Sequence, residues 1–477
     1  MALVAGVDSS TSGCKVQCHD ADSGEVVASG FAPHPPTTPP RSEQDPAAWW
    51  TAFMAAADEA DLFGANRPAA ISIAGQQHGL VALDDAGEVL RPAKLWNDTE
   101  SAPDAVALTE ALSGGAAAWA AASGSALVAA TTITKLRWLR RCERPTFDRL
   151  GAVLLPHDWL TSQLTGRATT DRGDASGTGW WSPTEERYRT DLLALVDADR
   201  DWPTLLPDVL APTETAGTWG PNGAVVGPGT GDNMAAALSL GLRPGDLAIS
   251  LGTSGTAFGV SEEAVVDPGG VVSGFADESG RHLPLVCTMN ATKVTNAVAR
   301  LLGVDPAELD RLALAADPGA DGLVLVPHLD GERTPNRPGA TGSLTGIRSN
   351  ITREQLARAA VEGVVCNLLD GAEHLAPWLD RGGSDRVLMT GGGARSTAFR
   401  QVLADLSGRP VVVPDERELV ARGAAIGAAA ALSGVNPAVV AERWPLTTSV
   451  TTPGSGDHRA IREAYRSRAD ERGEPCI

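Results

Sequence analysis

The chain has 477 residues, 43% of them hydrophobic, and a formal net charge of −20 at pH 7. Because one hydrophobic core stops growing at roughly 250–300 residues, this length predicts two domains. The acidic balance would repel a phosphate backbone and argues against nucleic acid as a partner, and no apolar run approaches the ~18 residues of a membrane span. Six cysteines without CxxC spacing encode neither a disulfide framework nor a zinc site. The first residues lack the basic segment of a secretory signal, so a cytoplasmic location is expected.

The chain opens on a strand, a polar turn and a returning strand. Residues 3–7 are the expected first strand, Asp8-Ser-Ser-Thr-Ser-Gly13 is the turn, and residues 15–19 form the returning strand. A second turn at residues 20–24 leads to a third strand at residues 25–29. The first thirty residues therefore predict a three-stranded meander.

The same pattern returns about half-way along the chain. Residues 247–251 and 256–260 are expected strands, and Gly252-Thr-Ser-Gly255 lies between them. Thr-Ser-Gly therefore occurs at residues 11–13 and again at residues 253–255. A repeated strand-turn-strand unit indicates two domains of related fold, each opening with a hairpin, rather than one continuous sheet.

Helices and short β-rich runs alternate after each hairpin. Helices are expected at residues 46–60 and 352–369, and strands at residues 71–74 and 387–390. Both halves therefore predict the α/β class.

A stretch rich in Pro, Gly and Thr, residues 207–231, separates the halves and leads into a helix that starts near Asn233. With the boundary near residue 241, an N-terminal domain is expected over residues 1–240 and a C-terminal domain over residues 241–445. Residues 446–477 mix Pro, Gly and many charges, so a tail with one exposed helix and a frayed end is expected.

The turn after the first strand offers groups that suit a phosphate and a metal ion. Thr11 and Ser12 supply hydroxyls and closely spaced amides, and Asp8 is a carboxylate partner for Mg²⁺ or its waters. An ordinary hairpin turn favours the same residue types. The repeat at Gly252 and Thr253 strengthens the functional interpretation, because two facing turns could hold a triphosphate from opposite domains.

Lysine is rare in this chain, with four lysines against thirty-five arginines. Lys15 follows the first turn and is therefore a candidate phosphate partner. Lys94, Lys135 and Lys293 are equally rare and could be ordinary surface residues, so only its position singles out Lys15.

A glycine cluster, Thr390-Gly-Gly-Gly-Ala-Arg-Ser396, follows the strand expected at residues 387–389 and precedes a helix that begins near Thr397. Glycines let the backbone approach a flat or anionic ligand closely, as nucleotide sites require. A tight strand-to-helix turn would use the same residues. The position of the cluster, in the second half and at a helix start, favours a nucleotide site.

Phosphorylation of an alcohol requires a carboxylate that accepts the hydroxyl proton while the phosphoryl group leaves ATP. Asp232 is the candidate, because it lies in the glycine-flanked loop Pro228-Gly-Thr-Gly-Asp-Asn233 that enters a helix at the domain boundary. A helix N-cap would explain the same residue. The two roles are compatible, since backbone bonds at a cap stabilise the ionised carboxylate.

Two strand ends carry polar side chains that suit a sugar. Gln76, Gln77 and His78 end one strand, and Trp96 lies in the segment Leu95-Trp-Asn-Asp98 that follows another. Polar groups where strands leave an open α/β sheet often contact ligands, and amide, imidazole and indole groups can bind the hydroxyls of a ketose. His78 alone would more often be a structural histidine, but its neighbours favour binding.

Taken in this order, the segments resemble those of the FGGY carbohydrate kinases along nearly all of residues 1 to about 445, and among these most closely the xylulokinases. The order carries more weight than any single motif. The resemblance rests on Ser42-Glu-Gln-Asp-Pro46 with Trp49-Trp50, Gly75-Gln-Gln-His-Gly79, Leu95-Trp-Asn-Asp98, Gly231-Asp-Asn233, Ser250-Leu-Gly-Thr-Ser-Gly255, Gly331-Glu-Arg-Thr-Pro335 and Gly391-Gly-Gly-Ala-Arg395.

The two signatures of that family are kept to different degrees. The second is intact from Gly342-Ser-Leu-Thr-Gly-Ile347 to Glu362, whereas the first is only partly kept around residues 132–139. Two departures fall inside the expected site: Ser9-Ser10 stands where the family usually has an apolar residue and Gly, and Gln77 stands where xylulokinases commonly have Met. An amide in place of a thioether could change the sugar preference.

The resemblance implies a role for each candidate residue. Asp232 would be the proton acceptor and Asp8 would hold Mg²⁺, with ATP as the phosphoryl donor. Further residues would bind the two substrates: Gln77, His78, Trp96 and Asn233 the sugar, Thr11 and Thr253 the phosphates, and Gly392 and Gly393 the adenosine. Ser12, Lys15 and Gly252 complete the expected ATP-binding set through their places in the two turns.

The fold implied by the resemblance is the pair of ribonuclease-H-like domains, with a cleft between them, that actin, hexokinase and Hsp70-type ATPases share. The implied reaction is the ATP-dependent phosphorylation of D-xylulose to D-xylulose 5-phosphate. A homodimer is a further implication of the family alone.

Three alternatives stay open at this point. The substrate could be ribulose, gluconate or glycerol, because stereochemistry at one carbon cannot be read from a sequence. The chain could instead be an actin-like ATPase that switches a protein partner, which would need neither Asp232 nor a sugar pocket. A catalytically inactive sugar sensor is the third, and the retention of Asp8, Thr253 and Asp232 argues against it.

Overall fold

The computed structural model describes residues 2–379, 386–451 and 458–470. Its contacts define two compact units. The first comprises residues 1–242, 261–283 and 418–445, and the second comprises residues 243–260, 284–417 and 446–477. Each unit therefore combines segments that are far apart in the sequence. The division expected from the sequence, at residues 240 and 445, cuts the chain into continuous segments, and it stays a prediction.

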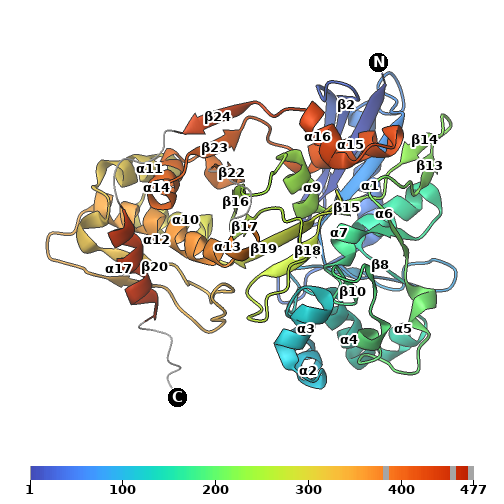
Figure 1. Cartoon of the computed structure of the whole chain (residues 1–477), viewed down its shortest axis with the longest axis horizontal. Helices are drawn as coiled ribbons and strands as arrows, with labels where there is room; N and C mark the ends of the chain where they lie inside the picture. The colour runs from blue at the N-terminus through green and yellow to red at the C-terminus, as the bar shows by residue number, and fades with distance from the viewer. Residues whose placement is uncertain (1, 380–385, 452–457, 471–477) are drawn as a thin grey trace. The chain divides into compact units, whose positions relative to one another are not determined.

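The first unit contains most of the strands and helices of the chain (Figure 1). Its strands are β1 (Leu3–Ser9), β2 (Gly13–Asp20), β3 (Val26–Pro33), β4 (Glu43–Gln44), β5 (Ala70–Gly75), β6 (Val81–Leu83), β7 (Ala93–Lys94), β8 (Ala152–Leu154), β9 (Thr169–Asp171), β10 (Trp181–Ser182), β11 (Arg187–Tyr188), β12 (Asp208–Leu210), β13 (Gly217–Trp219), β14 (Ala224–Val226), β15 (Thr230–Gly231) and β18 (Ser273–Ala276). Its helices are α1 (Pro46–Glu59), α2 (Ala102–Ala111), α3 (Gly115–Ser123), α4 (Thr132–Cys142), α5 (Arg144–Asp148), α6 (Pro156–Thr165), α7 (Arg172–Ala175), α8 (Thr190–Leu193), the 3-10 turn η1 (Trp202–Leu205), α9 (Asp232–Ser239), α15 (Leu419–Ser433) and α16 (Pro437–Arg443).

The central sheet of this unit has the order β13-β14-β5-β1-β2-β3, and β15 also pairs with β5. The meander expected at the start of the chain is confirmed, since β1 pairs antiparallel with β2 and β2 antiparallel with β3. Side chains of a strand alternate between the two faces of a sheet. Accordingly, Val4 joins the apolar cluster of α15, whereas Ala5 and Val7 join the cluster of α1 and α6 on the other face.

Helix α15 packs unusually close to the sheet and to α9. A Cβ atom added at Gly6 would lie 1.9 Å from the carbonyl oxygen of Ala421, and one added at Gly423 would lie 1.9 Å from that of Ala235. Glycine at both positions is therefore required by backbone contact. Among the described residues no single helix is long and apolar enough to cross a membrane; α15 and α16 meet that criterion only together, across a bend of 113°.

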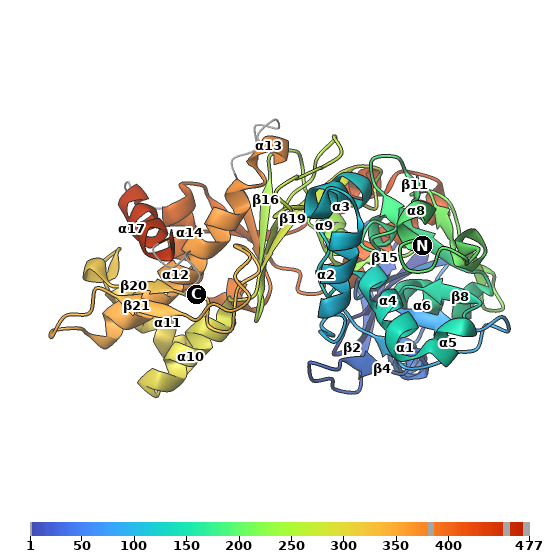
Figure 2. The same ribbon diagram turned by 90° about the horizontal axis from the view of Figure 1, so that it is seen from below.

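Helices α2 to α5 form a second cluster within the first unit (Figure 2). Their core contains Leu108, Trp119, Leu136 and Phe147, each of which is fully buried. This cluster adds apolar volume beside the loops that follow β5 and β7.

The second unit holds the remaining elements. They are β16 (Leu247–Leu251), β17 (Gly255–Phe258), β19 (His282–Thr288), α10 (Thr292–Leu302), α11 (Pro306–Ala315), the 3-10 turn η2 (Ala320–Gly322), β20 (Val324–Val326), β21 (Ser343–Thr345), α12 (Arg353–Glu373), α13 (Ala376–Leu379), β22 (Val387–Thr390), the 3-10 turn η3 (Gly392–Arg395), α14 (Thr397–Ser407), β23 (Val411–Pro414), β24 (Thr448–Thr451) and α17 (Arg459–Asp470). Strand β19 begins in the first unit and continues into the second.

The repeated hairpin predicted from the sequence is confirmed. In the second unit the strands follow the order β19-β17-β16-β22-β23-β24. β16 pairs antiparallel with β17 and parallel with β22, just as β1 pairs antiparallel with β2 and parallel with β5. The two Thr-Ser-Gly turns thus connect paired strands in two sheets of the same local topology.

The expected helix near the end of the chain is present as α17. It is not fully exposed, because Tyr465 is buried. The frayed end expected after it falls on residues 471–477, outside the described residues.

Candidate active site

Three parallel strands of the first unit, β1, β5 and β15, end side by side. The register pairs Asp8 of β1 with Ala74 of β5, and Thr230 of β15 with the same Ala74. Because parallel strands have their carboxyl ends at one edge of the sheet, the residues that follow them meet there. Asp8, the segment of residues 76–78 and Asp232 therefore leave the sheet at the same edge.

Asp8 carries a buried oxygen without a protein partner: within the described part of the chain its Oδ1 accepts no hydrogen bond. Burial, and then the charge of Asp232, raise the pKa of Asp8 to about 7, while Lys15 acts in the opposite direction. Lys15 lies directly opposite Asp8 in the β1–β2 register and forms an ion pair with Glu418. An unpaired carboxylate oxygen beside a second carboxylate is a donor set that suits a hard divalent cation.

Asp232 is the first residue of α9, and Gly231 takes the N-cap position. The N-cap role weighed for Asp232 is therefore wrong by one residue. Its Oδ1 atom accepts hydrogen bonds from the backbone N–H of Asn233 at 2.8 Å and from the side-chain amide of Asn233 at 3.0 Å. Burial raises the pKa of Asp232 to about 6, and these bonds limit the rise. The carboxylate is thus ionised at neutral pH yet basic enough to accept a proton.

Gln77 connects the side chain of Asn233 to the interior of the unit. Its Oε1 accepts a hydrogen bond of 2.8 Å from Asn233 Nδ2, and its Nε2 donates a long one of 3.5 Å to Asp174 Oδ1. A Cβ atom at Gly231 would lie 2.8 Å from Gln77 Cγ, so glycine leaves the space that the Gln77 side chain occupies. The predicted sugar residue Gln77 is therefore fixed against the predicted base through Asn233.

His78 has a left-handed backbone, with φ of +64°. Its Nδ1 lies 2.8 Å from the carbonyl oxygen of Gly177, and because a carbonyl oxygen only accepts, Nδ1 carries a hydrogen. The ring packs on Phe275 with centroids 5.8 Å apart. A non-glycine residue held in this backbone conformation is common at binding sites.

The hydroxyl of Thr11 joins the first turn to the predicted sugar residues. It donates to Gln76 Oε1 and accepts from Trp96 Nε1, both at 2.9 Å. The indole of Trp96 is 42% exposed, so a face of the ring is open to a ligand. Ser12 is exposed, and its carbonyl accepts from the backbone of His34. Thr11 therefore lies between the predicted phosphate and sugar positions.

A buried group of charged residues behind Gln77 was missed by the sequence analysis. His157 Nε2 lies 3.1 Å from Asp158, 3.3 Å from Asp171 and 3.4 Å from Asp174. Burial lowers the pKa of His157, but the three carboxylates outweigh it and raise this pKa to about 9. Burial also raises the pKa of Asp174 well above its usual range. The polar pair His157-Asp158, which Leu155 and Pro156 separate from the apolar strand β8, was the only sequence signal for this group.

In the second unit, the predicted phosphate turn is held by its carbonyls. Thr292 donates to the carbonyl oxygen of Gly252 from its backbone N–H at 3.0 Å and from its hydroxyl at 2.7 Å. The backbone N–H of Ala291 donates to the carbonyl oxygen of Thr253 at 3.1 Å. The side chain of Thr253 is exposed. The turn is thus anchored through its carbonyls, while Thr253 itself is exposed.

The glycine cluster lies at a cavity of about 430 Å³ in the second unit. Gly392, Gly393 and Ser396 contribute to its wall, together with residues of α10 and α11. A Cβ atom at Gly393 would lie 2.7 Å from Leu251 Cβ, whereas one at Gly392 would meet no atom within 4 Å. Protein packing therefore requires glycine at position 393, and Gly392 faces open space where a ligand could approach.

Lys94 and Lys135, which the sequence analysis allowed as ordinary surface residues, are both buried. Lys94 Nζ contacts Asp98 at 2.9 Å, Glu100 at 2.6 Å and Glu43 at 3.2 Å, and its ammonium group fills the centre of this carboxylate cluster. Lys135 is also fully buried, and burial lowers its pKa to about 7. The cluster around Asp98 is a buried ion-pair group, so the polar end of that segment is structural.

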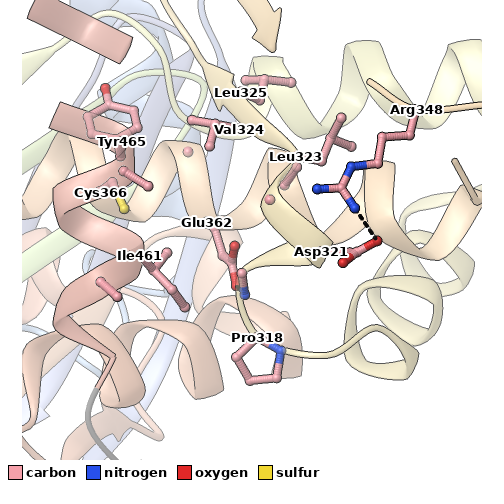
Figure 3. Close-up of a pocket in the computed structure, with 16 residues that line it drawn as sticks. Pro318, Asp321, Leu323, Val324, Leu325, Arg348, Glu362, Cys366, Ile461 and Tyr465 are labelled. Atoms are coloured by element: carbon pink, nitrogen blue, oxygen red, sulfur yellow. Dashed lines mark hydrogen bonds and ion pairs between the residues drawn. The ribbon is translucent and has the colours of Figure 1, made fainter. Parts of the chain in front are cut away.

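A larger cavity, of about 470 Å³, lies elsewhere in the second unit, between η2, β20, α12 and α17 (Figure 3). Arg348 and Asp321 form an ion pair of 3.9 Å at its edge. None of the residues predicted to bind ATP, sugar or metal lines it.

The second family signature supports a strained turn beside that cavity. Residues 319–322 all have positive φ, between 47° and 85°. Glu362 accepts a hydrogen bond of 2.9 Å from the backbone N–H of Gly319. A Cβ atom at Gly346 would lie 2.1 Å from the carbonyl oxygen of Gly322, so only glycine fits there. Gly346 and Glu362 of this signature therefore have a structural role in this chain.

Comparison with known proteins identifies the family. Residues 3–239 match the N-terminal domain of the FGGY family of carbohydrate kinases, and residues 247–432 match its C-terminal domain. The chain belongs to this family, and its fold is the two-domain fold of actin- and hexokinase-type ATPases, as expected from the sequence. The protein is therefore a carbohydrate kinase.

Several relatives are similar over most of their length. A xylulose kinase of Streptomyces coelicolor is 50% identical over 449 residues, which cover 93% of this chain and 90% of the relative. One of Streptomyces rubiginosus is 49% identical with the same coverage. The crystal structure of xylulose kinase from Bifidobacterium adolescentis superposes with a TM-score of 0.87 at 41% identity, covering 98% of this chain and 99% of that one.

Proposed function

We propose that this kinase transfers the γ-phosphoryl group of ATP to D-xylulose, which gives D-xylulose 5-phosphate and ADP. The observation that carries the proposal is the agreement between relatives named xylulose kinase at about half identity over nine-tenths of the chain and an ionisable carboxylate, Asp232, at the edge that bears the predicted sugar residues. Neither the alternative sugars nor the ATPase switch has an equivalent observation in its favour.

In the proposed reaction Asp232 accepts the proton of the C5 hydroxyl of the sugar. The oxygen of that hydroxyl forms a bond to the γ-phosphorus of ATP, while the bond between the γ-phosphorus and the oxygen that bridges it to the β-phosphorus breaks. The pKa of about 6 keeps this carboxylate ionised at pH 7. Gln77 and Asn233 fix its position through their hydrogen bonds. Trp96 and His78 supply a flat face and a polar ring for the sugar.

Magnesium is part of the proposal, and the residues present fit it. Asp8 combines an oxygen without a protein partner and a pKa raised to about 7 by burial and by Asp232. A divalent cation held by Asp8, directly or through water, would neutralise the phosphate charge of ATP. Thr11 and Ser12 on the first turn, and Gly252 and Thr253 on the second, would bind the phosphates, and Gly392 and Gly393 would adjoin the adenosine.

Lys15 enters the proposal in a changed form. Its ion pair with Glu418 means that the ammonium group already has a carboxylate partner. It would meet a phosphate only by sharing its charge with that residue. A cytoplasmic location and a homodimeric assembly remain predictions from the sequence and the family.

The test is an ADP-release assay with D-xylulose, D-ribulose, gluconate and glycerol as acceptors. D-xylulose should give the highest kcat/KM, with little ADP released when no sugar is present. A higher kcat/KM for another acceptor would move the substrate assignment within the family. ADP release at the same rate with and without every acceptor would instead favour the ATPase switch.

A further inference from the structure

Glu332 is a buried carboxylate to which the proposed mechanism gives no role. It lies in the loop Gly331-Glu-Arg-Thr-Pro335, one of the segments that carry the family resemblance, and is only 1% exposed. An ionised group at such a depth is costly unless its oxygens are fully bonded. A carboxylate retained there needs a reason beyond packing.

Both oxygens of Glu332 are bonded, and by neutral donors. Oε1 accepts from the backbone N–H of Met289 at 2.6 Å and of Arg333 at 2.8 Å. Oε2 accepts from the side-chain amides of Asn290 at 2.8 Å and Asn367 at 3.1 Å. Four acceptor sites on one rigid group are what a carboxylate offers and a neutral amide does not.

These bonds hold the segment that anchors the predicted phosphate turn. Met289 and Asn290 directly precede Ala291 and Thr292, whose N–H and hydroxyl groups bond the carbonyls of Gly252 and Thr253. Asn290 is itself fully buried. Glu332 therefore fixes, through one short stretch of backbone, the donors that orient the turn.

The direction of those carbonyls sets the direction of the amides beside them. In a trans peptide unit the C=O and the following N–H point to opposite sides. With the carbonyls of Gly252 and Thr253 drawn toward residues 291–292, the N–H groups of Thr253 and Ser254 face away from them. A phosphate needs donors aimed outward from the turn, so this orientation is the productive one.

We propose that Glu332 is a positioning residue for ATP, which sets the peptide orientation of Gly252 to Ser254 through residues 289–292 without touching the nucleotide. The proposal rests on the proposed function, because it assumes that this turn meets the phosphates. It assigns a purpose to the Gly-Glu-Arg-Thr-Pro segment, which lies in the second unit and away from Asp232 in the sequence.

The first test is Glu332→Gln, which keeps the size of the side chain. Its amide nitrogen would face the donors on Asn290 and Asn367, so those contacts are lost. We expect KM for ATP and Kd for ADP to rise roughly tenfold, because the loss of a hydrogen bond to a charged group changes an equilibrium constant by about that factor. KM for the sugar and Kd for adenosine, which has no phosphate, should change by less than about twofold.

Cys366→Ala is the matched control for lost stability. Cys366 is fully buried on α12, next to Asn367 in the sequence. Its truncation should lower the melting temperature through a small cavity while leaving Kd for ADP unchanged. If Glu332→Gln weakened adenosine and ADP binding equally, Glu332 would be a general structural residue and the proposal would be overturned.

A compensating exchange sharpens the test. Asn367→Asp alone places two carboxylates together and should weaken ADP binding. When Asn367→Asp is combined with Glu332→Gln, the introduced carboxylate accepts a hydrogen bond from the introduced amide. The contacts that Tyr465 and His328 make with Oδ1 of residue 367 can persist in this double variant. The double variant should bind ADP more tightly than either single variant. Additive losses would contradict coupling through this contact.

Failure of the proposed function can be told apart with Gly252→Ala. A Cβ atom there would meet only Ser254 O at 3.4 Å, so the protein tolerates it, but it would obstruct a phosphate at the turn. Unchanged KM for ATP in Gly252→Ala would show that the turn does not meet the phosphates, and the proposed function would fail at this point. A raised KM in Gly252→Ala but not in Glu332→Gln would overturn the role of Glu332 alone.

Discussion

The two hairpin turns share one topology and differ in their surroundings. Beside the first turn lie three carboxylates, Asp8, Asp232 and Glu418, with Lys15 among them. The second turn is held by backbone and hydroxyl donors from residues 291–292. Two copies of one strand-turn-strand scaffold therefore present different chemistry.

The difference indicates that the two turns have different functions. A turn surrounded by carboxylates suits a cation and the deprotonation of an alcohol, whereas a turn defined by its amides suits a phosphate. Duplicated topology explains the shared backbone, and the residues packed behind each turn explain the divergence. Variants that affect only one of the two turns separate these roles.

The largest effect is expected from Asp232→Asn in the first unit. Loss of a general base typically costs about 10²–10⁴-fold in kcat, and Kd for ADP should stay nearly constant. Asp191→Asn is the matched control, because Asp191 is an exposed acid of the same unit. Steady-state kinetics and calorimetry measure both values. Near-normal kcat in Asp232→Asn would remove the base assignment.

Asp8→Asn should reduce kcat by roughly 10–100-fold and raise the Mg²⁺ concentration needed for half-maximal rate. The same variant should be more stable at pH 8. The folded-state pKa of about 7 lies above the unfolded value, so the ionised side chain destabilises the native state at pH 8, and this cost vanishes as pH falls below about 4.

Thermal unfolding of Asp8→Asn and of the native chain, with and without Mg²⁺, measures the expected change in stability. We expect a melting temperature ~1–5 °C above that of the native chain at pH 8 without metal, and no gain at low pH. A loss of stability at pH 8, or an unchanged Mg²⁺ dependence, would contradict the proposed cation site.

The pH profile should show an acidic limb near pH 6. Asp232 must be ionised to accept a proton, so kcat should fall about tenfold per pH unit below its pKa of about 6 and level off above it. At limiting Mg²⁺ the limb should move toward pH 7, because Asp8 must lose its proton before it binds the cation. If the position of this acidic limb did not change with the Mg²⁺ concentration, the proposed role of Asp8 in metal binding would be contradicted.

The smallest effects compare the two threonines directly. Thr11→Val breaks the bonds to Gln76 and Trp96, so it should raise KM for both sugar and ATP, by about three- to tenfold. Thr253→Val should raise KM for ATP alone. Equal patterns in the two variants would mean that the turns do not differ in function.

Much of this arrangement could be predicted from the sequence. The two hairpins, the strand before the glycine cluster and helix α14 after it all have local signals in turn residues and apolar periodicity, and the structure contains them. The family motifs placed Asp8 and Asp232 in one expected site, but their position at the same edge of the sheet depends on β15, a strand that the sequence analysis did not predict. Gly231 at the N-cap shows the usual one-residue error at a helix start.

The features that escaped prediction depend on distant contacts. Strands β13 and β14 lie in a stretch rich in Pro and Gly, and β14 becomes a strand by pairing with β5. His157 and Asp174 are brought together by tertiary packing, since α6 and α7 both pack against β9. The burial of Lys94 depends on Glu43 and Glu100, which no spacing rule connects to it.

Helix α15 also has a consequence for how the protein is made. The sheet face around Val4 and Gly6 is covered by a helix that leaves the ribosome only after most of the second unit has been synthesised. Until then the nascent first unit exposes an apolar surface shaped for that helix. We therefore expect a chaperone, or another segment of the chain, to cover this apolar surface during synthesis.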